Sequence, residues 1–334
     1  METLREKDGL GASLLSPRKR TYRSGNSHRR LRKEIREKSK DPASESTELA
    51  AGVQMHDFAT KLEDNEDGSL LGSIETDDFI DATLSQPLKI VYRDDNYVAV
   101  FKPAGLIVHR SKSTLEQEPV LLQRLRDQLR CHLYPVHRLD RPTAGLILFG
   151  LSGAAAAKMV ELFTNRMVAK YYQALVYGLT PDAGFIDQPL GAKSDDEWTQ
   201  GIHDYRLPQD ALTQFETLAR FYVSWENPAT NPSQFSLLEI KPMTGRSHQI
   251  RRHLNHIGHP VIGDHRHGDK NQNELAVAGT GVVRMLLTSM RLDFRHPYSS
   301  ELLSILVGRG SEFDRVVATM EPHRTKSEGS GVNT

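Results

Sequence analysis

The chain has 334 residues, which at about 100–200 residues per domain allows one large domain or two modest ones with a sizeable core. Its 43 basic and 43 acidic side chains cancel, and its single cysteine excludes an intramolecular disulfide framework and a thiolate zinc cluster. That cysteine usage suits a reducing compartment. No apolar run approaches the roughly 18 residues of a membrane-spanning helix, so we expect no membrane partner.

The zero net charge hides two oppositely charged segments at the N-terminus. Residues 1–40 carry 13 basic and 5 acidic side chains, whereas residues 41–87 carry 1 basic and 12 acidic ones. Neither segment has a sustained strand or helix period, so residues 1–87 are predicted to be a largely disordered extension. The basic part fits either a solvated arm or a segment that contacts RNA or serves as a nuclear address. The acidic part fits either a linker or a mask for the basic part.

Short periodic segments begin at residue 88. Strands are predicted at 88–93, 97–102, 146–149, 170–177, 215–222, 235–241, 284–289 and 302–307, and helices at 121–129 and from the N-cap residue Ser152 onward. Strands outnumber helices and do not alternate regularly with them. This order predicts an α+β fold with a mixed, mostly antiparallel central sheet flanked by helices and loops. We expect one catalytic domain over 88–320, a long loop over 188–214 and a disordered tail over 321–334.

The first segment that could carry chemistry surrounds Asp140. This carboxylate is followed by Pro142 and Gly145 and then by an apolar strand, which predicts a rigid turn at the end of a strand. Side chains at such turns often point into clefts, so Asp140 is a candidate nucleophile. An ion pair or turn cap between Asp140 and its neighbours Arg138 and Arg141 is the structural alternative.

The second segment, residues 241–260, predicts a helix with one apolar and one basic side. Ile250, Leu254 and Ile257 fall at helical spacing, and the opposite side carries several arginines and histidines. Such a surface suits a phosphate backbone, although a solvated basic face has the same pattern. The histidines lack a zinc-protease spacing and have arginine neighbours, so we expect no metal site and no zinc-dependent hydrolase.

The third segment is the predicted strand 170–177. Tyr172, Ala174 and Val176 share one face of this strand. The tyrosine ring therefore either projects toward the site that Asp140 serves or packs in the core.

Together these segments resemble one known family. HRLDRPTAGLILF, KYYQA and TGRSHQIRRHLNHIGHPVIGD occur in the order found in RluA-type pseudouridine synthases, and the resemblance covers roughly residues 88–307. Two further segments, KPAGLIVHRS and GDHRHGDKNQN, resemble the TruC-type branch, which modifies position 65 of tRNA. Many relatives have tyrosine where this chain has His267. The resemblance implies the pseudouridine synthase fold and the isomerisation of a uridine, with base flipping and without a cofactor or metal.

The resemblance also implies roles for individual residues. Asp140 corresponds to the catalytic aspartate, Arg246 to the arginine that pairs with it, Tyr172 to the active-site tyrosine, and Arg138 to the arginine that enters the stack when the base leaves. The remaining residues that we expect to contact RNA are His109, Arg110, His137, Arg141, His248, Arg251 and Arg252.

For partners, we expect tRNA as the substrate of a monomeric enzyme. A cytoplasmic location suits this work, and nuclear or organellar locations stay open. Two alternatives remain, a ribosomal RNA pseudouridine synthase and a catalytically silent protein that binds or folds RNA. A carboxylate with a partner arginine favours an enzyme, because a pure binding module would not need a nucleophile.

The basic arm yields a prediction about salt. If the arm contacts phosphates, the affinity for RNA falls steeply with salt, and deletion of residues 1–40 flattens the slope of log affinity against log salt concentration. Filter-binding titrations of the full and shortened chains at several salt concentrations measure the two slopes. Equal slopes would show that the arm takes no part in binding.

Overall fold

In a computed structural model, the chain is described at residues 86–110, 118–191, 207–224 and 233–325. The predicted N-terminal extension lies almost wholly outside these residues, as does much of the predicted loop over 188–214. Within the described part, no helix combines the length and the apolar character needed to cross a membrane.

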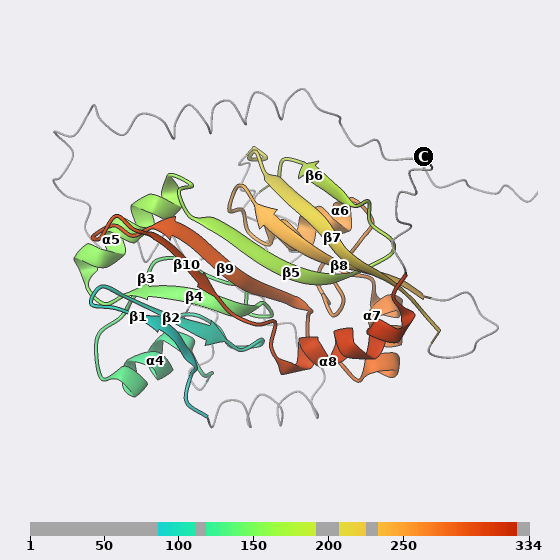
Figure 1. Cartoon of the computed structure of the whole chain (residues 1–334), viewed down its shortest axis with the longest axis horizontal. Coiled ribbons are helices and arrows are strands. Elements are labelled where there is room, and N and C mark those ends of the chain that lie inside the picture. The colour runs from blue at the N-terminus through green and yellow to red at the C-terminus, as the bar shows by residue number, and fades with distance from the viewer. Residues whose placement is uncertain (1–85, 111–117, 192–206, 225–232, 326–334) are drawn as a thin grey trace, which may run out of the picture. The chain divides into compact units, whose positions relative to one another are not determined.

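One mixed sheet organises the described residues (Figure 1). Its strands are β1 (Ile90–Arg93), β2 (Tyr97–Lys102), β3 (Tyr134–Pro135), β4 (Ala144–Gly150), β5 (Ala169–Tyr177), β6 (Ala183–Asp187), β7 (Leu212–Val223), β8 (Ser233–Pro242), β9 (Leu287–Arg295) and β10 (Leu302–Leu306). The main path is β1-β2-β4-β9-β5-β8-β7-β6, with β3 on β4 and β10 on β9. Among these named strands only the β4–β9 pair is parallel, which confirms the predicted mixed, mostly antiparallel α+β fold.

Helices flank this sheet. They are α4 (Leu121–Leu129), α5 (Gly153–Thr164), α6 (Gln249–His256), α7 (Lys270–Thr280) and α8 (Ser311–Met320), followed by the 3₁₀ helix η1 (Glu321–His323). The Ser152 hydroxyl accepts a hydrogen bond from the amide of Ala155, so the predicted N-cap of α5 is confirmed.

Several boundaries differ from the sequence predictions, two of them by more than a few residues. The strand predicted at 284–289 begins at Leu287 and continues to Arg295, because Leu292 and Phe294 extend its buried face beyond residue 289. The predicted tail from residue 321 is wrong for 321–325, because η1 and a bridge between Arg324 and Phe221 hold this segment on β7. The sequence analysis also missed β3, β6, α7 and α8.

The core occupies both faces of the sheet because neighbouring residues of a strand point to opposite sides. In β2, Val98 and Val100 join a cluster beneath α4 and α6, while Tyr97 and Ala99 join a second cluster with α5. A third cluster packs β5, β7 and β8 against α7 and α8. Burial on both faces explains why β4 reads as a continuous apolar run rather than an alternating one.

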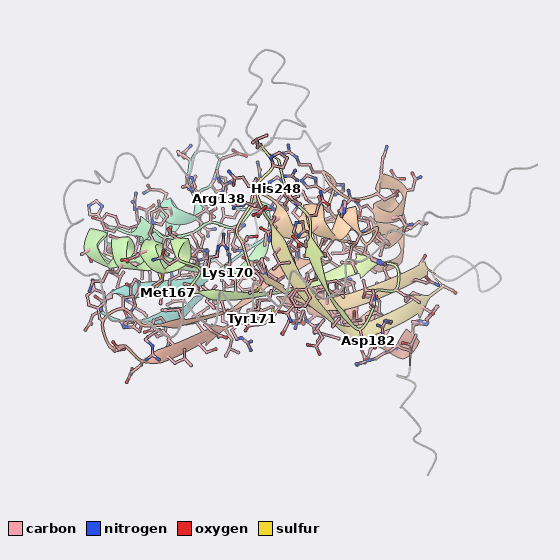
Figure 2. The ribbon with its side chains drawn as sticks, turned by 90° about the horizontal axis from the view of Figure 1, so that it is seen from above. Arg138, Met167, Lys170, Tyr171, Asp182 and His248 are labelled. Carbon is pink, nitrogen blue, oxygen red and sulfur yellow. The ribbon has the colours of Figure 1, made fainter. Side chains whose placement is uncertain are left out.

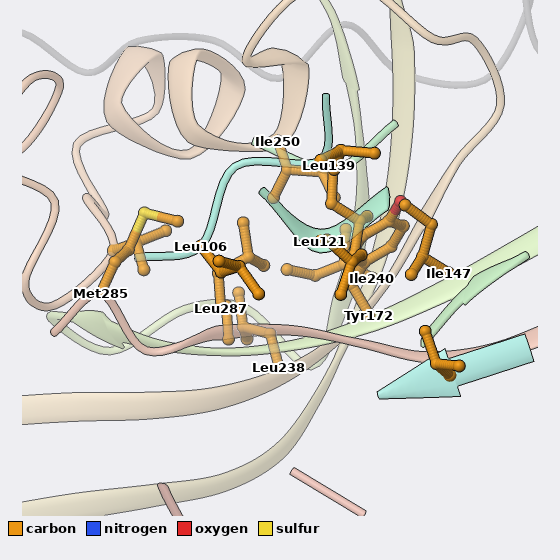
Figure 3. Packing of buried hydrophobic residues seen from close by; sticks show 14 of the residues in the cluster. Leu106, Leu121, Leu139, Ile147, Tyr172, Leu238, Ile240, Ile250, Met285 and Leu287 are labelled. Atoms are coloured by element: carbon orange, nitrogen blue, oxygen red, sulfur yellow. The ribbon is translucent and has the colours of Figure 1, made fainter. Parts of the chain in front are cut away.

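The cluster beneath α4 and α6 supports the segments that carry the candidate site (Figure 3). It joins Leu139, next to Asp140, to Tyr172 of β5 and to Ile250 of α6. Three segments that are distant in sequence therefore meet through their apolar neighbours.

The parallel junction between β4 and β9 places the Asp140 turn against the sheet. Gly145 pairs with Ser289, and Ser289 also pairs with Tyr172 of β5. At Gly145 the backbone has φ of +111°, and a Cβ there would lie 2.2 Å from the carbonyl oxygen of Ser289. Only glycine permits this approach.

Replacement of Gly145 by alanine is therefore expected to destabilise the protein. The strained backbone and the clash with β9 should together lower the free energy of unfolding by about 3 kcal/mol or more. Urea unfolding followed by circular dichroism measures the loss. Gly308→Ala is the matched control, because a Cβ at Gly308 would meet no atom within 4 Å. Equal stabilities of the two variants would contradict the role of the junction.

Candidate active site

The loop that carries Asp140 is fixed by hydrogen bonds to the segment after β2. Lys102 is fully buried, and its ammonium group donates to the carbonyl oxygens of Arg141 at 2.9 Å and Leu106 at 2.6 Å. The amide of Gly105 donates to the same Arg141 carbonyl at 2.9 Å. A buried cation that is satisfied by backbone oxygens fixes the chain on both sides of it. The loop is thus held immediately after Asp140.

The guanidinium that pairs with Asp140 belongs to Arg251. Its Nη1 lies 3.2 Å from Oδ2 of Asp140, and its Nε and Nη2 each donate at 2.8 Å to the two carboxylate oxygens of Asp264. The Arg251 side chain is 5% exposed and that of Asp264 is 1% exposed. Arg251 of α6 therefore binds two carboxylates that come from different segments of the chain. We predicted it as a contact to RNA, but its side chain lies inside the protein.

The predicted pairing of Arg246 with Asp140 is wrong. Arg246 lies before the start of α6, and its Nε donates instead to the carbonyl oxygen of Asp210 at 3.1 Å. The buried amide of Gln249 fixes this geometry. Its oxygen accepts from the Arg246 amide and the Thr244 hydroxyl, and its nitrogen donates to the carbonyl oxygen of Leu212.

The helix start explains why the sequence pattern pointed to the wrong arginine. The helix begins at Gln249, and His248 before it has a left-handed backbone with φ of 50°. More of α6 is buried than an apolar stripe predicts, because Arg251 and His253 lie inside together with Ile250 and Leu254. In the sequence, Arg251 lies on the flank of the apolar stripe formed by Ile250 and Leu254. That position was the available signal that its side chain could be buried.

Asp140 is held in its ionised form. Burial alone would raise the pKa of this carboxyl, but the charges of His248 and Arg251, the hydrogen bond from Arg251 and the charge of Arg138 hold its pKa below the usual value. Its side chain nevertheless remains 22% exposed. The site therefore presents an ionised carboxylate that a substrate can reach.

Tyr172 lies on the face of β5 that looks toward this carboxylate. Burial and the negative charge of Asp140 raise the pKa of its phenol, so the ring stays protonated and neutral. Ala174 and Val176 pack in the same cluster, as the alternation in the strand predicted. The phenol can therefore stack on a base or pass on a proton, but it does not start as a phenolate.

Three of the predicted RNA contacts are used within the protein. The Nε2 of His137 accepts a hydrogen bond from the amide of Leu148 at 3.0 Å, and burial lowers the pKa of His137 to about 3. Arg252 donates to the carbonyl oxygen of Gly191, and Arg141 pairs with Glu118 at 2.8 Å. His137 is thus a neutral support for β4, and its Nε2 is already used by that strand.

Four further basic side chains come from the segments around the site. Arg138 and His248 both lower the pKa of Asp140, and Figure 2 labels both on the same side of the molecule. Arg110 is exposed and His109 is half-buried at the end of the segment that Lys102 anchors. These positions suit groups that meet a polyanion.

The sequence analysis missed Lys170. This residue shares a face of β5 with Tyr172, and its Nζ would lie 3.6 Å from a Cβ at Gly245. Burial and the charge of Arg166 lower the pKa of Lys170 to about 8. Its position two residues before Tyr172 on one strand was the available signal.

The histidines near α6 are bound to protein groups. Both ring nitrogens of His253 lie within 3.0 Å of protein oxygens, the Thr213 hydroxyl and the Gln188 carbonyl. Within the described ranges, no three His, Cys, Asp or Glu side chains are grouped as metal ligands.

Comparison with known proteins identifies the family. The sequence profile described as RNA pseudouridylate synthase matches residues 96–256. The chain is 40% identical over 221 residues to tRNA pseudouridine synthase C of Pasteurella multocida, with 66% of this chain and 91% of that protein covered. It is 38% identical over 214 residues to the protein of the same name from Vibrio vulnificus, with 64% and 87% covered. This chain belongs to the RNA pseudouridylate synthase family.

Solved structures agree with this membership. Human RNA Pseudouridylate Synthase Domain Containing 1 superimposes with a TM-score of 0.51 at 28% identity, covering 66% of this chain and 83% of that one. Human RNA Pseudouridylate Synthase Domain Containing 4 gives a TM-score of 0.54 at 25% identity, covering 72% and 95%. The enzyme is therefore a pseudouridine synthase, an RNA uridine isomerase.

The bridging arginine generates a prediction for this synthase. Arg251→Met leaves the carboxylates of Asp140 and Asp264 without their shared partner, so the free energy of unfolding at pH 7 should fall by about 3–5 kcal/mol. Arg246→Gln removes one backbone hydrogen bond and should cost about 1 kcal/mol or less. Urea unfolding of both variants measures the difference.

The same variants have a predicted pH dependence. Arg251 lowers the folded-state pKa of both carboxyls, so the stability it provides is present above their unfolded pKa of about 4 and is lost as pH falls through the folded values. The gap between the wild type and Arg251→Met should therefore narrow below about pH 4. A gap that is independent of pH would contradict this electrostatic role.

Proposed function

We propose that this enzyme isomerises a uridine of tRNA to pseudouridine, with Asp140 as the group that begins the reaction. The observation that carries the proposal is the ionised and partly exposed carboxylate that Arg251 holds at the end of a rigid loop. The proposal treats the enzyme as a monomer.

The reaction needs three changes at one nucleotide. The bond between N1 and C1′ breaks, the uracil turns while it stays in the pocket, and a new bond joins C5 to C1′ as the C5 proton leaves. No atom is gained or lost overall. Attack on C1′, attack on the ring and removal of the C2′ proton all begin with an unprotonated carboxylate, which is the form that Arg251 maintains in Asp140.

The neighbouring residues suit the other steps. The neutral ring of Tyr172 offers a surface on which the freed uracil can stack, and its hydroxyl can pass on the proton that C5 releases. A flipped base leaves a gap in its stack at a cost of a few kcal/mol, and Arg138 beside Asp140 is placed to fill that gap. Arg110, His109, His248 and Lys170 would then meet the phosphates.

The choice of tRNA is supported by the relatives. Proteins named tRNA pseudouridine synthase C align over about nine-tenths of their length at 38–40% identity. Ribosomal RNA remains the second candidate substrate, because the reaction would be the same. A silent RNA-binding protein is disfavoured by the ion pair itself, since binding alone does not require a partly exposed, ionised carboxylate.

Replacement of Asp140 by asparagine tests the proposal. The amide keeps the size of the side chain but cannot attack or take a proton, so pseudouridine formation should fall by at least about 10⁴-fold. Binding to tRNA should stay nearly unchanged. The measurement is chemical labelling and sequencing of unmodified total RNA after incubation with the wild type and with Asp140→Asn.

Each outcome of this experiment is informative. A single new site in tRNA that is absent with Asp140→Asn supports the proposal. New sites confined to ribosomal RNA would retain the reaction and reject tRNA. Pseudouridine formed by Asp140→Asn would reject the assignment of the nucleophile.

A further inference from the structure

Two histidines, His248 and His267, contact each other near Asp140. Nδ1 of His248 lies 2.8 Å from Nε2 of His267, and the two rings meet edge to face with centroids 5.1 Å apart and an interplanar angle of 73°. His248 is one of the groups that lower the pKa of Asp140. His267 thus contacts a side chain that acts on the catalytic carboxylate, although it stands outside the residues that the reaction uses.

The loop that carries His267 is built on Asp264. Oδ1 of Asp264 accepts hydrogen bonds from the amide of His267 at 3.0 Å and the amide of Arg266 at 3.1 Å, in addition to the bond from Arg251. The carbonyl oxygen of Asp264 accepts from the amide of Gly268 at 2.8 Å, and a Cβ at Gly268 would lie 2.2 Å from that oxygen. The backbone around His267 is therefore tightly closed.

Asn273 of α7 secures the same loop from the other side. Its buried amide nitrogen donates to the Asp264 carbonyl at 3.1 Å, and its oxygen accepts from the amide of Gly263 at 2.8 Å. The carboxylate that anchors Arg251 thus also positions His267. The buried carboxylate of Asp264 therefore positions both Arg251 and His267.

The charges around the pair determine which ring donates. His267 is faced by Arg251 and Arg252 from α6 and by Asp264 and Arg266 from its own loop. Burial and the charge of Arg251 lower its pKa to about 4, so it is neutral at neutral pH. At their contact one ring nitrogen donates and the other accepts, and a neutral His267 offers an unprotonated nitrogen as the acceptor. The negative Asp140 beside His248 favours an N–H on that ring, so Nδ1 of His248 is assigned as the donor.

We propose that His267 is a positioning residue whose Nε2 accepts a hydrogen bond from Nδ1 of His248 and so holds that imidazole beside Asp140. His248 has a left-handed backbone, with φ of 50°, just before α6, and its ring contacts His267. The inference rests on the proposed function, because it assigns a support to the same carboxylate.

The proposal has a consequence at acidic pH. When His267 gains a proton its Nε2 becomes a donor, and two donors then face each other across 2.8 Å. The contact opens, and His248 is released from Asp140. The value of kcat/KM for the wild type should therefore fall as pH approaches about 4, the pKa of His267.

Two substitutions at His267 separate positioning from packing. His267→Phe keeps a ring but removes the acceptor, and kcat/KM at pH 7.5 should fall about 10- to 100-fold, the range for a group that orients an active-site histidine. His267→Tyr supplies a phenol oxygen that accepts a hydrogen bond, so this variant should retain most of the activity. Because the phenol gains no proton at acidic pH, its kcat/KM should fall less steeply toward about pH 4 than that of the wild type. His265→Phe, on the same loop at an exposed position, is the matched control and should resemble the wild type.

The measurements are kcat and KM on an unmodified tRNA transcript from about pH 3.5 to 8, so that the range crosses the pKa of His267, with urea unfolding of each variant. Equal activities of His267→Phe and His267→Tyr, or an acidic fall shared unchanged by the wild type and His267→Tyr, would overturn the proposal. Losses of kcat/KM that are proportional to the losses in free energy of unfolding would overturn the proposal as well.

A second readout does not depend on activity. In a long-range ¹⁵N–¹H correlation spectrum of the labelled full chain at pH 7, Nε2 of His267 should have the shift of an unprotonated nitrogen, and His267→Phe identifies its signal. A protonated Nε2 would reject the proposed direction of the hydrogen bond. This spectrum also separates the two proposals, because an inactive wild type with the expected tautomer would reject the proposed function alone.

Discussion

The site depends on one buried guanidinium that serves two carboxylates. Arg251 uses a fork of two nitrogens on Asp264 and a third nitrogen on Asp140. A buried arginine with a single partner would be held less rigidly, and a buried aspartate without a partner would take up a proton. The arrangement anchors the cation on the fully buried Asp264 and offers the remaining nitrogen to the partly exposed Asp140. The carboxylate of Asp140 thereby stays charged without being fully enclosed.

The sheet supplies the rigid frame for this pairing. Asp140 precedes β4, Tyr172 lies on β5 and Ser289 of β9 pairs with both strands, so the three meet at the parallel junction. Gly145 permits the close approach, and Lys102 fixes the loop from below through backbone oxygens. These contacts involve main-chain atoms rather than flexible side-chain ends.

The cations around the candidate site fall into two groups with different roles. Lys102 and Arg251 are buried and satisfied by protein oxygens, and they build the site. Arg138 and His248 lie nearer the open side and tune Asp140 through their charge. The sequence alone does not separate these groups, because both stand within motifs that look uniformly basic. Burial, which depends on the fold, separates them.

The sequence by itself determined the fold class, the family and the main segments of the site. The alternation in β5 was enough to place Tyr172 with Ala174 and Val176, and the turn residues after Asp140 were enough to place a loop before β4. These features are local, since strand alternation and turn chemistry act over a few residues. The tertiary structure decided which arginine meets Asp140, because the start of α6 depends on the buried amide of Gln249 and its bond to β7. It also decided that His267 faces His248, since that contact joins positions 19 residues apart through a loop built on Asp264. Contacts of this kind depend on packing between elements, which a periodic pattern does not record.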